Sequence, residues 1–165
     1  MIQIDPENLN ENFIKLIGRD WMLITAGNIK SFNTMTAAWG SIGFLWNRPV
    51  ALCYVRPTRF TFDFMEKNND FTLSFFEEQY KDALNVCGVK SGRDTDKIKE
   101  TGLIPMETKN GNIYFKQARL VMECKKIYTD FIFPEKFIDK SIDKNYPLKD
   151  YHKMYIGQIM HCFKL

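Results

Sequence analysis

The sequence lacks the features of several protein classes. Its four cysteines stand singly at Cys53, Cys87, Cys124 and Cys162, without a CxxC pair. This spacing argues against a metal or dithiol site and fits free thiols in a reducing cytoplasm. The formal net charge is only +3, and basic and acidic residues are interspersed, so no surface for nucleic acid is indicated. We therefore expect a cytoplasmic protein that does not bind nucleic acid.

Membrane, nucleotide-fold and metal signals are also missing. The longest apolar stretch, residues 35–46, is interrupted by polar residues and glycines and is shorter than the roughly 20 residues that span a bilayer. The first seven residues carry acidic side chains where a secretory signal has positive charge. No GxGxxG or Walker motif predicts a Rossmann-type or P-loop site. His152 and His161 have no cysteine or carboxylate at metal-ligand spacing, so no metal is expected.

The chain does have a high apolar content. Hydrophobic residues make up 45% of its 165 residues and aromatic residues 15%, which is enough to form a core without disulfides or metal. No repeat, low-complexity tract or linker divides the sequence. We therefore expect a single domain over residues 1–165.

Short β-strands dominate the predicted secondary structure, with a turn at residues 27–28. Asn110-Gly111 is the strongest hairpin signal, because both residues accept positive φ. Gly157 indicates a bulge or a close backbone approach in the last strand. Strands are expected near residues 21–26, 33–45, 50–55, 71–76, 104–108, 112–115, 120–132 and 154–163, and helices near 59–67, 77–86, 94–100 and 136–144. This pattern predicts a mainly β fold with helical insertions, built as a barrel.

The segment RPTRFT at residues 56–61 is a candidate phosphate site. Pro57 disfavours a helix at the preceding residue, while Thr58 can cap a helix that begins near Arg59. Two guanidinium groups, two hydroxyl groups and a helix N-terminus then lie within six residues, a combination that suits a phosphate. The alternative is a simple helix cap with two solvated arginines, which the local pattern alone favours.

The segment SFNTMTAAWG at residues 31–40 is a candidate site for a flat heterocycle. Small side chains such as Thr34, Ala37 and Gly40 allow backbone donors and acceptors to approach the edge of a ring. The alternative is a polar strand edge with Trp39 in the core.

Four segments in order resemble the flavin reductase-like family. They are NTMTAAWG at residues 33–40, RPTRFT at 56–61, SGRDTDK at 91–97 and HKMYIG at 152–157. The resemblance extends from about Trp21 to the end of the chain. It implies a split β-barrel of the FMN-binding type, usually a homodimer with the flavin near the subunit interface.

The resemblance also implies a set of cofactor contacts. The strand at residues 33–36 would line the isoalloxazine edge, residues 56–61 would surround the FMN phosphate, residues 91–97 would lie beside the cofactor, and His152 and Tyr155 would approach the ring. No catalytic side chain is expected, because the flavin carries the redox chemistry. The implied FMN-binding residues are Asn33, Thr34, Met35, Thr36, Ala37, Trp39, Arg56, Thr58, Arg59, Thr61, Ser91, Gly92, Lys97 and His152.

By the same resemblance, the expected activity is that of an NAD(P)H-dependent oxidoreductase. NAD(P)H would serve as a transient electron donor, and free flavin, ferric iron or a protein would accept electrons from the bound FMN. One alternative is a flavoredoxin-like electron carrier that shuttles electrons between protein partners without fast reaction with a nicotinamide. A more distant alternative is a binding or structural barrel without flavin.

Overall fold

Antiparallel strands build most of the molecule, for which the computed structural model describes residues 2–164. The main sheet has the strand order β3-β2-β6-β9-β10-β5-β4, with β1 added beside β10, and a separate hairpin pairs β7 with β8. The strands are β1 (Ile2–Ile4), β2 (Met22–Asn28), β3 (Ser31–Ala37), β4 (Gly40–Leu45), β5 (Arg48–Val55), β6 (Asp70–Phe75), β7 (Pro105–Glu107), β8 (Ile113–Phe115), β9 (Leu120–Phe131) and β10 (Lys153–Lys164).

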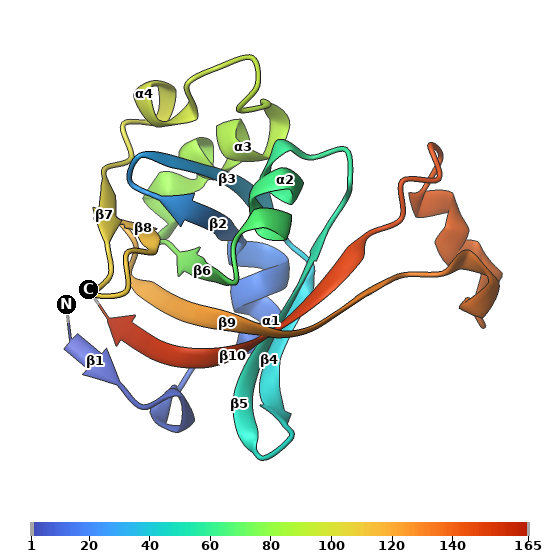
Figure 1. Ribbon diagram of the computed structural model, residues 1–165, viewed down its shortest axis with the longest axis horizontal. Coiled ribbons are helices and arrows are strands. Elements are labelled where there is room, and N and C mark those ends of the chain that lie inside the picture. Colours follow the sequence, from blue (N-terminus) through green and yellow to red (C-terminus); the bar gives the residue numbers. More distant parts are fainter. Residues whose placement is uncertain (1, 165) are drawn as a thin grey trace.

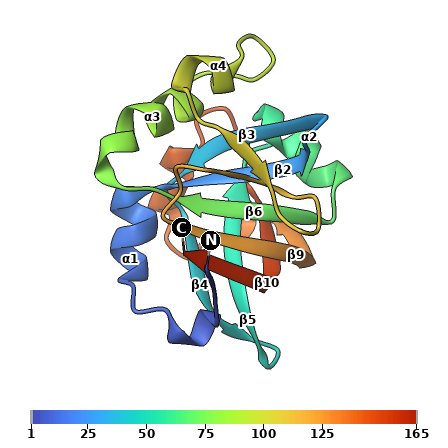
Figure 2. The same cartoon turned by 90° about the vertical axis from the view of Figure 1, so that its left-hand side faces the viewer.

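The main sheet is curled into an open barrel. Strands β3 and β4 stand at opposite ends of the hydrogen-bonded order, yet only Ala38 and Trp39 separate them along the chain. The two ends of the sheet therefore meet at this corner without pairing, and the strands curve around one core (Figures 1 and 2). The expected fold class, a mainly β split barrel with helical insertions, is confirmed.

Strand periodicity explains the two faces of the sheet. In β6, Phe71, Leu73 and Phe75 point into the barrel core, and all three are buried. The intervening Thr72 and Ser74 are also buried, because a second apolar layer that includes the β7-β8 hairpin covers the outer face of this strand. The central strands thus lie between two apolar layers.

Helices occupy the connections between strands. Helix α2 contacts β2 and β3, and its Met65 is fully buried in the barrel core. Helix α3 packs on β3 from the other flank, with α4 beside it (Figure 1). The helices are α1 (Phe13–Lys15), which continues as a π-type turn over Leu16–Asp20, α2 (Phe60–Lys67), α3 (Lys81–Val89) and α4 (Lys97–Thr101).

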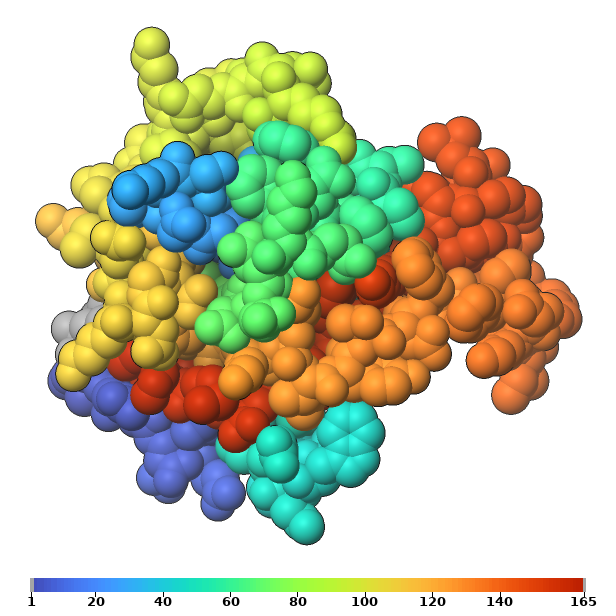
Figure 3. Space-filling view, in the orientation of Figure 1, coloured from blue at the N-terminus to red at the C-terminus, as the bar shows by residue number. Residues whose placement is uncertain are grey.

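An arm formed by residues 132–152 leaves the barrel between β9 and β10. It projects well beyond the body of the molecule (Figure 3). The helix expected at residues 136–144 is wrong, because the arm contains two short 3-10 segments, Pro134–Lys136 and Lys140–Asn145. At its base the Ile132 amide donates to the His152 carbonyl, 2.9 Å away.

The structure corrects two further expectations near the start of the sheet. The turn predicted at residues 27–28 lies two residues later, because Asn28 pairs with Ser31 across the strands. The single extended stretch predicted at residues 33–45 is two strands that end at different edges of the sheet.

The hairpin around Asn110-Gly111 is confirmed, with Glu107 opposite Ile113. Within residues 2–164, no helix is both long and apolar enough to cross a membrane.

Candidate functional site

The loop from β5 to α2 places Arg59 at the start of a helix. Arg59 is the N-cap residue of α2, and its side chain does not cap the helix. The Phe62 amide donates to the Arg59 carbonyl at 2.9 Å, and no side-chain cap takes the amides of the two residues before it. The Thr58 cap expected from sequence is wrong, because the Thr58 hydroxyl donates instead to the Asp150 carboxylate at 3.3 Å. Burial, together with the neighbouring Arg56, lowers the pKa of Arg59. Arg59 therefore brings an incompletely hydrated positive charge to a helix N-terminus.

Arg56 already has an anionic partner. Its Nη1 donates to both carboxylate oxygens of Asp150, at 2.9 and 3.1 Å, and its Nη2 donates to the Asn145 carbonyl at 2.9 Å. The guanidinium also lies over the Tyr146 ring, 5.1 Å from its centroid. Arg56 thus ties the arm to the barrel, and Asp150 neutralises its charge.

Lys97 is a buried lysine held by neutral groups. Only 5% of its surface is exposed, and its Nζ donates to the carbonyls of Thr34 and Cys87 at 2.9 and 3.0 Å. Burial lowers the pKa of Lys97 to about 8, with a further contribution from Arg59. A buried ammonium without a carboxylate partner is a costly arrangement that an anionic ligand would relieve.

Arg59 and Lys97 line one cavity of about 200 Å³, which we call the Arg59–Lys97 cavity. It lies between the N-terminus of α2 and the C-terminal end of α3. In the part of the chain that the structure describes, its lining contains three cationic side chains and no Asp or Glu. The lining residues are Thr58, Arg59, Phe60, Thr61, Val89, Lys90, Ser91 and Lys97.

A second cavity of about 200 Å³, the Trp39–His152 cavity, shares Arg59 with the first. The centroid of the His152 ring lies 5.0 Å from that of the Trp39 ring, and the His152 Nδ1 is 2.9 Å from the Tyr146 hydroxyl. Burial, and to a lesser extent Arg56, lowers the pKa of His152 to about 4, so the imidazole is neutral at pH 7. The lining residues are Met35, Thr36, Ala37, Ala38, Trp39, Tyr54, Arg56, Arg59 and His152.

The structure gathers most of the expected site residues around these two cavities, but Asn33, Thr34 and Gly92 line a third one. Asn33 is buried and donates through Nδ2 to the Thr61 hydroxyl at 2.7 Å. Gly92 packs against the Asn33 side chain so closely that a Cβ at this position would lie 2.2 Å from its Oδ1. These residues thus hold β3, α2 and the loop at residues 91–97 together. The third cavity is lined on one side by residues 29–34 and on the other by Phe60, Phe64 and residues 92–98.

Sequence reasoning missed Asp150, Tyr54 and Tyr146. Asp150 is 94 residues from Arg56, and no local pattern could pair them. Tyr54 lies between two buried residues of β5. This alternation predicts a strand, but it does not indicate that Tyr54 lines a cavity. Tyr155 is fully buried and donates to Glu66 Oε1 at 2.8 Å, so the expected approach of Tyr155 to the ring site is wrong.

The family comparison matches almost the whole chain. The model described as Flavin reductase like domain matches residues 15–163. The chain belongs to the flavin reductase-like family. A comparison with curated proteins gave no match.

Solved structures share the fold of this flavin reductase-like protein at low sequence identity. An FMN-binding protein from Thermus thermophilus with bound p-hydroxybenzaldehyde is 18% identical, with a TM-score of 0.70 over 100% of this chain and 82% of that chain. A flavoredoxin from Methanosarcina acetivorans is also 18% identical, with a TM-score of 0.70 over 100% and 75%. An NADH:FAD oxidoreductase from Streptomyces globisporus C-1027 is 14% identical, with a TM-score of 0.66 over 88% and 74%.

Proposed function

We propose that the chain is one FMN-binding domain that accepts electrons from NAD(P)H and passes them through the flavin to an acceptor. The observation that carries this proposal is the pair of cavities that share Arg59. Among residues 2–164, their combined lining has four cationic side chains, Arg56, Arg59, Lys90 and Lys97, and no carboxylate, although Arg56 pairs with Asp150 behind it. One end of the paired cavity suits a phosphate and the other a flat ring.

The Arg59–Lys97 cavity fits the phosphate of FMN. Arg59 can donate two parallel hydrogen bonds to phosphate oxygens, and Lys97 retains a third ammonium hydrogen beyond its two carbonyl contacts. Phe60 and Thr61, the first two residues of α2, line this cavity, and the positive end of the helix dipole favours negative charge there. Lys90 is less available, because it forms an ion pair with Glu100. Arg59 and Lys97 are therefore the principal phosphate ligands in this proposal.

The Trp39–His152 cavity fits the isoalloxazine ring. The small side chains of Ala37 and Ala38 leave room along one wall, and Trp39, Tyr54 and His152 offer flat aromatic faces. The Thr36 hydroxyl already donates to the Leu84 carbonyl, which leaves the backbone of β3 to contact the ring edge. When bound, the flavin supplies the hydride and electron transfer chemistry, and the protein orients it and excludes side reactions.

Assembly and partners form a further part of this proposal. Ile14 and Trp39 are 88% and 47% exposed, and they line a shared apolar hollow beside the Trp39–His152 cavity. This hollow supports a homodimer in which a second copy covers the ring end of the site. We place the protein in the cytoplasm, with free flavin, ferric iron or a protein as the electron acceptor.

The proposed function predicts the absorption spectrum of the purified protein. With FMN added, the protein is expected to show flavin bands that survive removal of unbound flavin. Addition of NADH or NADPH without oxygen should bleach these bands within seconds. The measurement is an anaerobic spectrum before and after each nicotinamide.

The other outcomes of that measurement have distinct meanings. Flavin bands that persist with both nicotinamides would replace the reductase with an electron carrier that another protein reduces. A protein that retains no flavin after FMN is supplied would rule out both flavin functions. Free FMN at the same concentration is the control for direct reaction with the nicotinamide.

The pKa of Lys97 predicts that FMN binding weakens at alkaline pH. Lys97 carries its proton below about pH 8 and loses it above. If bound phosphate keeps the ammonium charged, the affinity for FMN should fall about tenfold between pH 7 and pH 9. The phosphate itself is already a dianion across this range. The measurement is the FMN dissociation constant, from quenching of flavin fluorescence, at several pH values.

A Lys97→Gln variant provides the control for this dependence. Its FMN affinity should be low at pH 7 and nearly constant up to pH 9. Loss of folding does not explain the wild-type trend, because the pKa of Lys97 is lower in the folded state than in the unfolded state. The unfolded state therefore binds more protons between about pH 8 and 10.5, and this group makes the fold more stable as pH rises. A pH trend that persists in the variant would contradict the role given to Lys97.

A further inference from the structure

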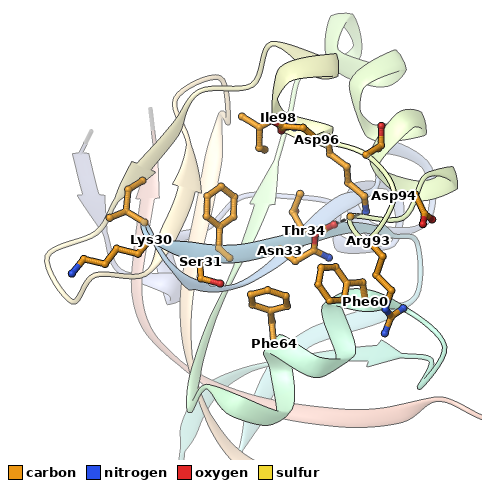
Figure 4. Close-up of a pocket in the computed structure, with 15 residues that line it drawn as sticks. Lys30, Ser31, Asn33, Thr34, Phe60, Phe64, Arg93, Asp94, Asp96 and Ile98 are labelled. Carbon is orange, nitrogen blue, oxygen red and sulfur yellow. Dashed lines mark hydrogen bonds between the residues drawn. The ribbon is translucent and has the colours of Figure 1, made fainter.

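A hydrogen bond between His152 and the arm is not used by the proposed function. The Tyr146 hydroxyl and the His152 Nδ1 are 2.9 Å apart, and both side chains are buried. His152 lines the Trp39–His152 cavity, whereas Tyr146 belongs to the arm and does not line it. This cavity shares no lining residue with the open third cavity drawn in Figure 4. A contact at His152 therefore concerns the ring end of the site alone.

Three aromatic rings fix the imidazole of His152. Its centroid lies 5.0 Å from that of Trp39, 5.5 Å from that of Tyr146 and 6.4 Å from that of Tyr54. Trp39 and Tyr54 line the cavity, and Tyr146 lies on the side of the arm. Because Nδ1 is turned toward Tyr146, the opposite edge of the ring, which carries Nε2, faces the cavity. His152 thus offers the cavity a polar atom in addition to its flat face.

The Nε2 atom of His152 is available to a ligand. Within residues 2–164, the hydrogen bond to Tyr146 is the only one that the His152 ring forms. The side-chain atoms in this range that are both buried and unpartnered are Asp70 Oδ1 and Ser74 Oγ, and Nε2 is not one of them. Solvent in the cavity therefore reaches Nε2.

The hydroxyl hydrogen of Tyr146 determines which nitrogen of His152 carries the proton. Burial raises the pKa of Tyr146 and lowers the pKa of His152 to about 4, so both side chains are neutral at pH 7. A neutral imidazole has one N–H and one acceptor nitrogen. If Nδ1–H donated to Tyr146, the buried phenol hydrogen would have no acceptor within residues 2–164, which is costly. The phenol therefore donates to Nδ1, and Nε2 carries the hydrogen.

We infer that Tyr146 is a positioning residue that holds neutral His152 with its hydrogen on Nε2, so that this end of the site binds a hydrogen-bond acceptor. The inference rests on the proposed function, since the isoalloxazine ring is the group that would meet Nε2–H. Carbonyl oxygens and unprotonated nitrogens along the edge of that ring accept hydrogen bonds. The Tyr146 ring is itself fixed, because it stacks on Phe137 with centroids 6.2 Å apart and lies 5.1 Å from the Arg56 guanidinium.

The first test is nitrogen NMR of the flavin-free full chain with isotope-labelled histidine at pH 7. In the wild type, His152 should show a protonated Nε2, identified by its coupling to both carbon-bound ring hydrogens, and a non-protonated Nδ1. Tyr146→Phe keeps the aromatic ring and removes the hydroxyl, so both tautomers become populated and the two resonances should move toward each other. The other histidine of the chain, His161, has its Nδ1 3.3 Å from Gln3 Nε2. Its resonances should not move and are the internal control.

The second test is the dissociation constant of FMN. Without the phenol, only a fraction of the molecules present Nε2–H, and the affinity for FMN falls by that fraction. Loss of one neutral hydrogen bond corresponds to about a fivefold change in an equilibrium constant, so Tyr146→Phe should weaken FMN binding about fivefold. Tyr151→Phe is the matched control, because it removes a hydroxyl from the neighbouring ring of the arm that donates to Asp143 Oδ1 at 2.7 Å. Its FMN affinity should stay within about twofold of wild type.

A role that acts through His152 also predicts how two substitutions combine. In a His152→Ala background, Tyr146→Phe should change FMN affinity by less than about twofold, because no imidazole is left to orient. A purely structural Tyr146 would weaken binding in both backgrounds. Thermal unfolding shows whether each variant folds. If His152→Ala does not fold, the NMR spectrum of the wild-type protein still decides the tautomer.

The possible results separate this inference from the proposed function. If the wild-type protein does not bind FMN, the proposed function fails, and the role of Nε2–H toward a flavin falls with it. If FMN binds but His152 carries its hydrogen on Nδ1, only the inference is overturned. It is also overturned if Tyr146→Phe leaves either the His152 resonances or the FMN affinity unchanged, or if it weakens FMN binding equally in both backgrounds.

Discussion

Replacing Arg59 with glutamine is expected to weaken FMN binding about a hundredfold. Each charge-assisted hydrogen bond contributes about 1.5–3 kcal/mol, and loss of a bidentate pair to the phosphate corresponds to about two powers of ten. Arg59 forms no ion pair with a carboxylate of residues 2–164, so its charge is available to a ligand. Arg59→Gln also removes only a long hydrogen bond of 3.4 Å to the Cys87 carbonyl, which limits the cost to folding. The measurement is the FMN dissociation constant at pH 7.

The neighbouring ion pair supplies the control. Arg56→Gln alone would leave the Asp150 carboxylate unpaired near the site and would repel a phosphate. The double variant Arg56→Gln, Asp150→Asn removes both charges together, and its FMN affinity should stay within about threefold of wild type. A loss as large as that of Arg59→Gln would instead place the phosphate at Arg56.

This contrast between Arg56 and Arg59 could not be predicted from the sequence. The motif at residues 56–61 indicated an anion site, and the structure does bring Arg59 to a helix N-terminus beside Lys97. The same motif offered no means of separating Arg56 from Arg59. That distinction depends on Asp150, a residue of the arm that is 94 positions from Arg56 in the sequence and pairs with its guanidinium. Long-range pairings of this kind leave no local pattern.

The fold was predictable where local chemistry agrees with the tertiary structure. Asn110-Gly111 forms its hairpin because Gly111 takes a φ of 82°, which the turn requires. The run at residues 33–45 misled because no proline or charged residue separates its two strands. The change of sheet edge at Ala38 and Trp39 reflects the curling of the sheet into an open barrel. The prediction of a helix over residues 136–144 was wrong because tertiary contacts decide the local structure there as well. There, ion pairs and aromatic contacts of the arm hold short 3-10 turns.

Gly157 is the position in β10 where the sequence predicted a bulge or a close approach. The structure bears this out, because the register between β10 and β9 shifts between Ile156 and Gly157. The backbone there lies directly over the barrel core. A Cβ on Gly157 would be 2.7 Å from two carbons of the Phe71 ring and 2.8 Å from the Cys124 Cβ. Phe71 and Cys124 are both fully buried, so neither has free space into which to move.

Gly157→Ala is therefore expected to lower the free energy of unfolding by about 3 kcal/mol, near the upper end for overpacking of a core. The measurement is urea unfolding followed by tryptophan fluorescence. Gly43→Ala is the matched control, since Gly43 lies on exposed β4 with nothing within 4 Å of the added Cβ, and its effect should stay within about 0.5 kcal/mol. Equal stability of the two variants would mean that β10 can move outward at the bulge. Because β10 pairs with β5, which leads into the Arg59 loop, the destabilised variant should also release FMN at lower urea than wild type.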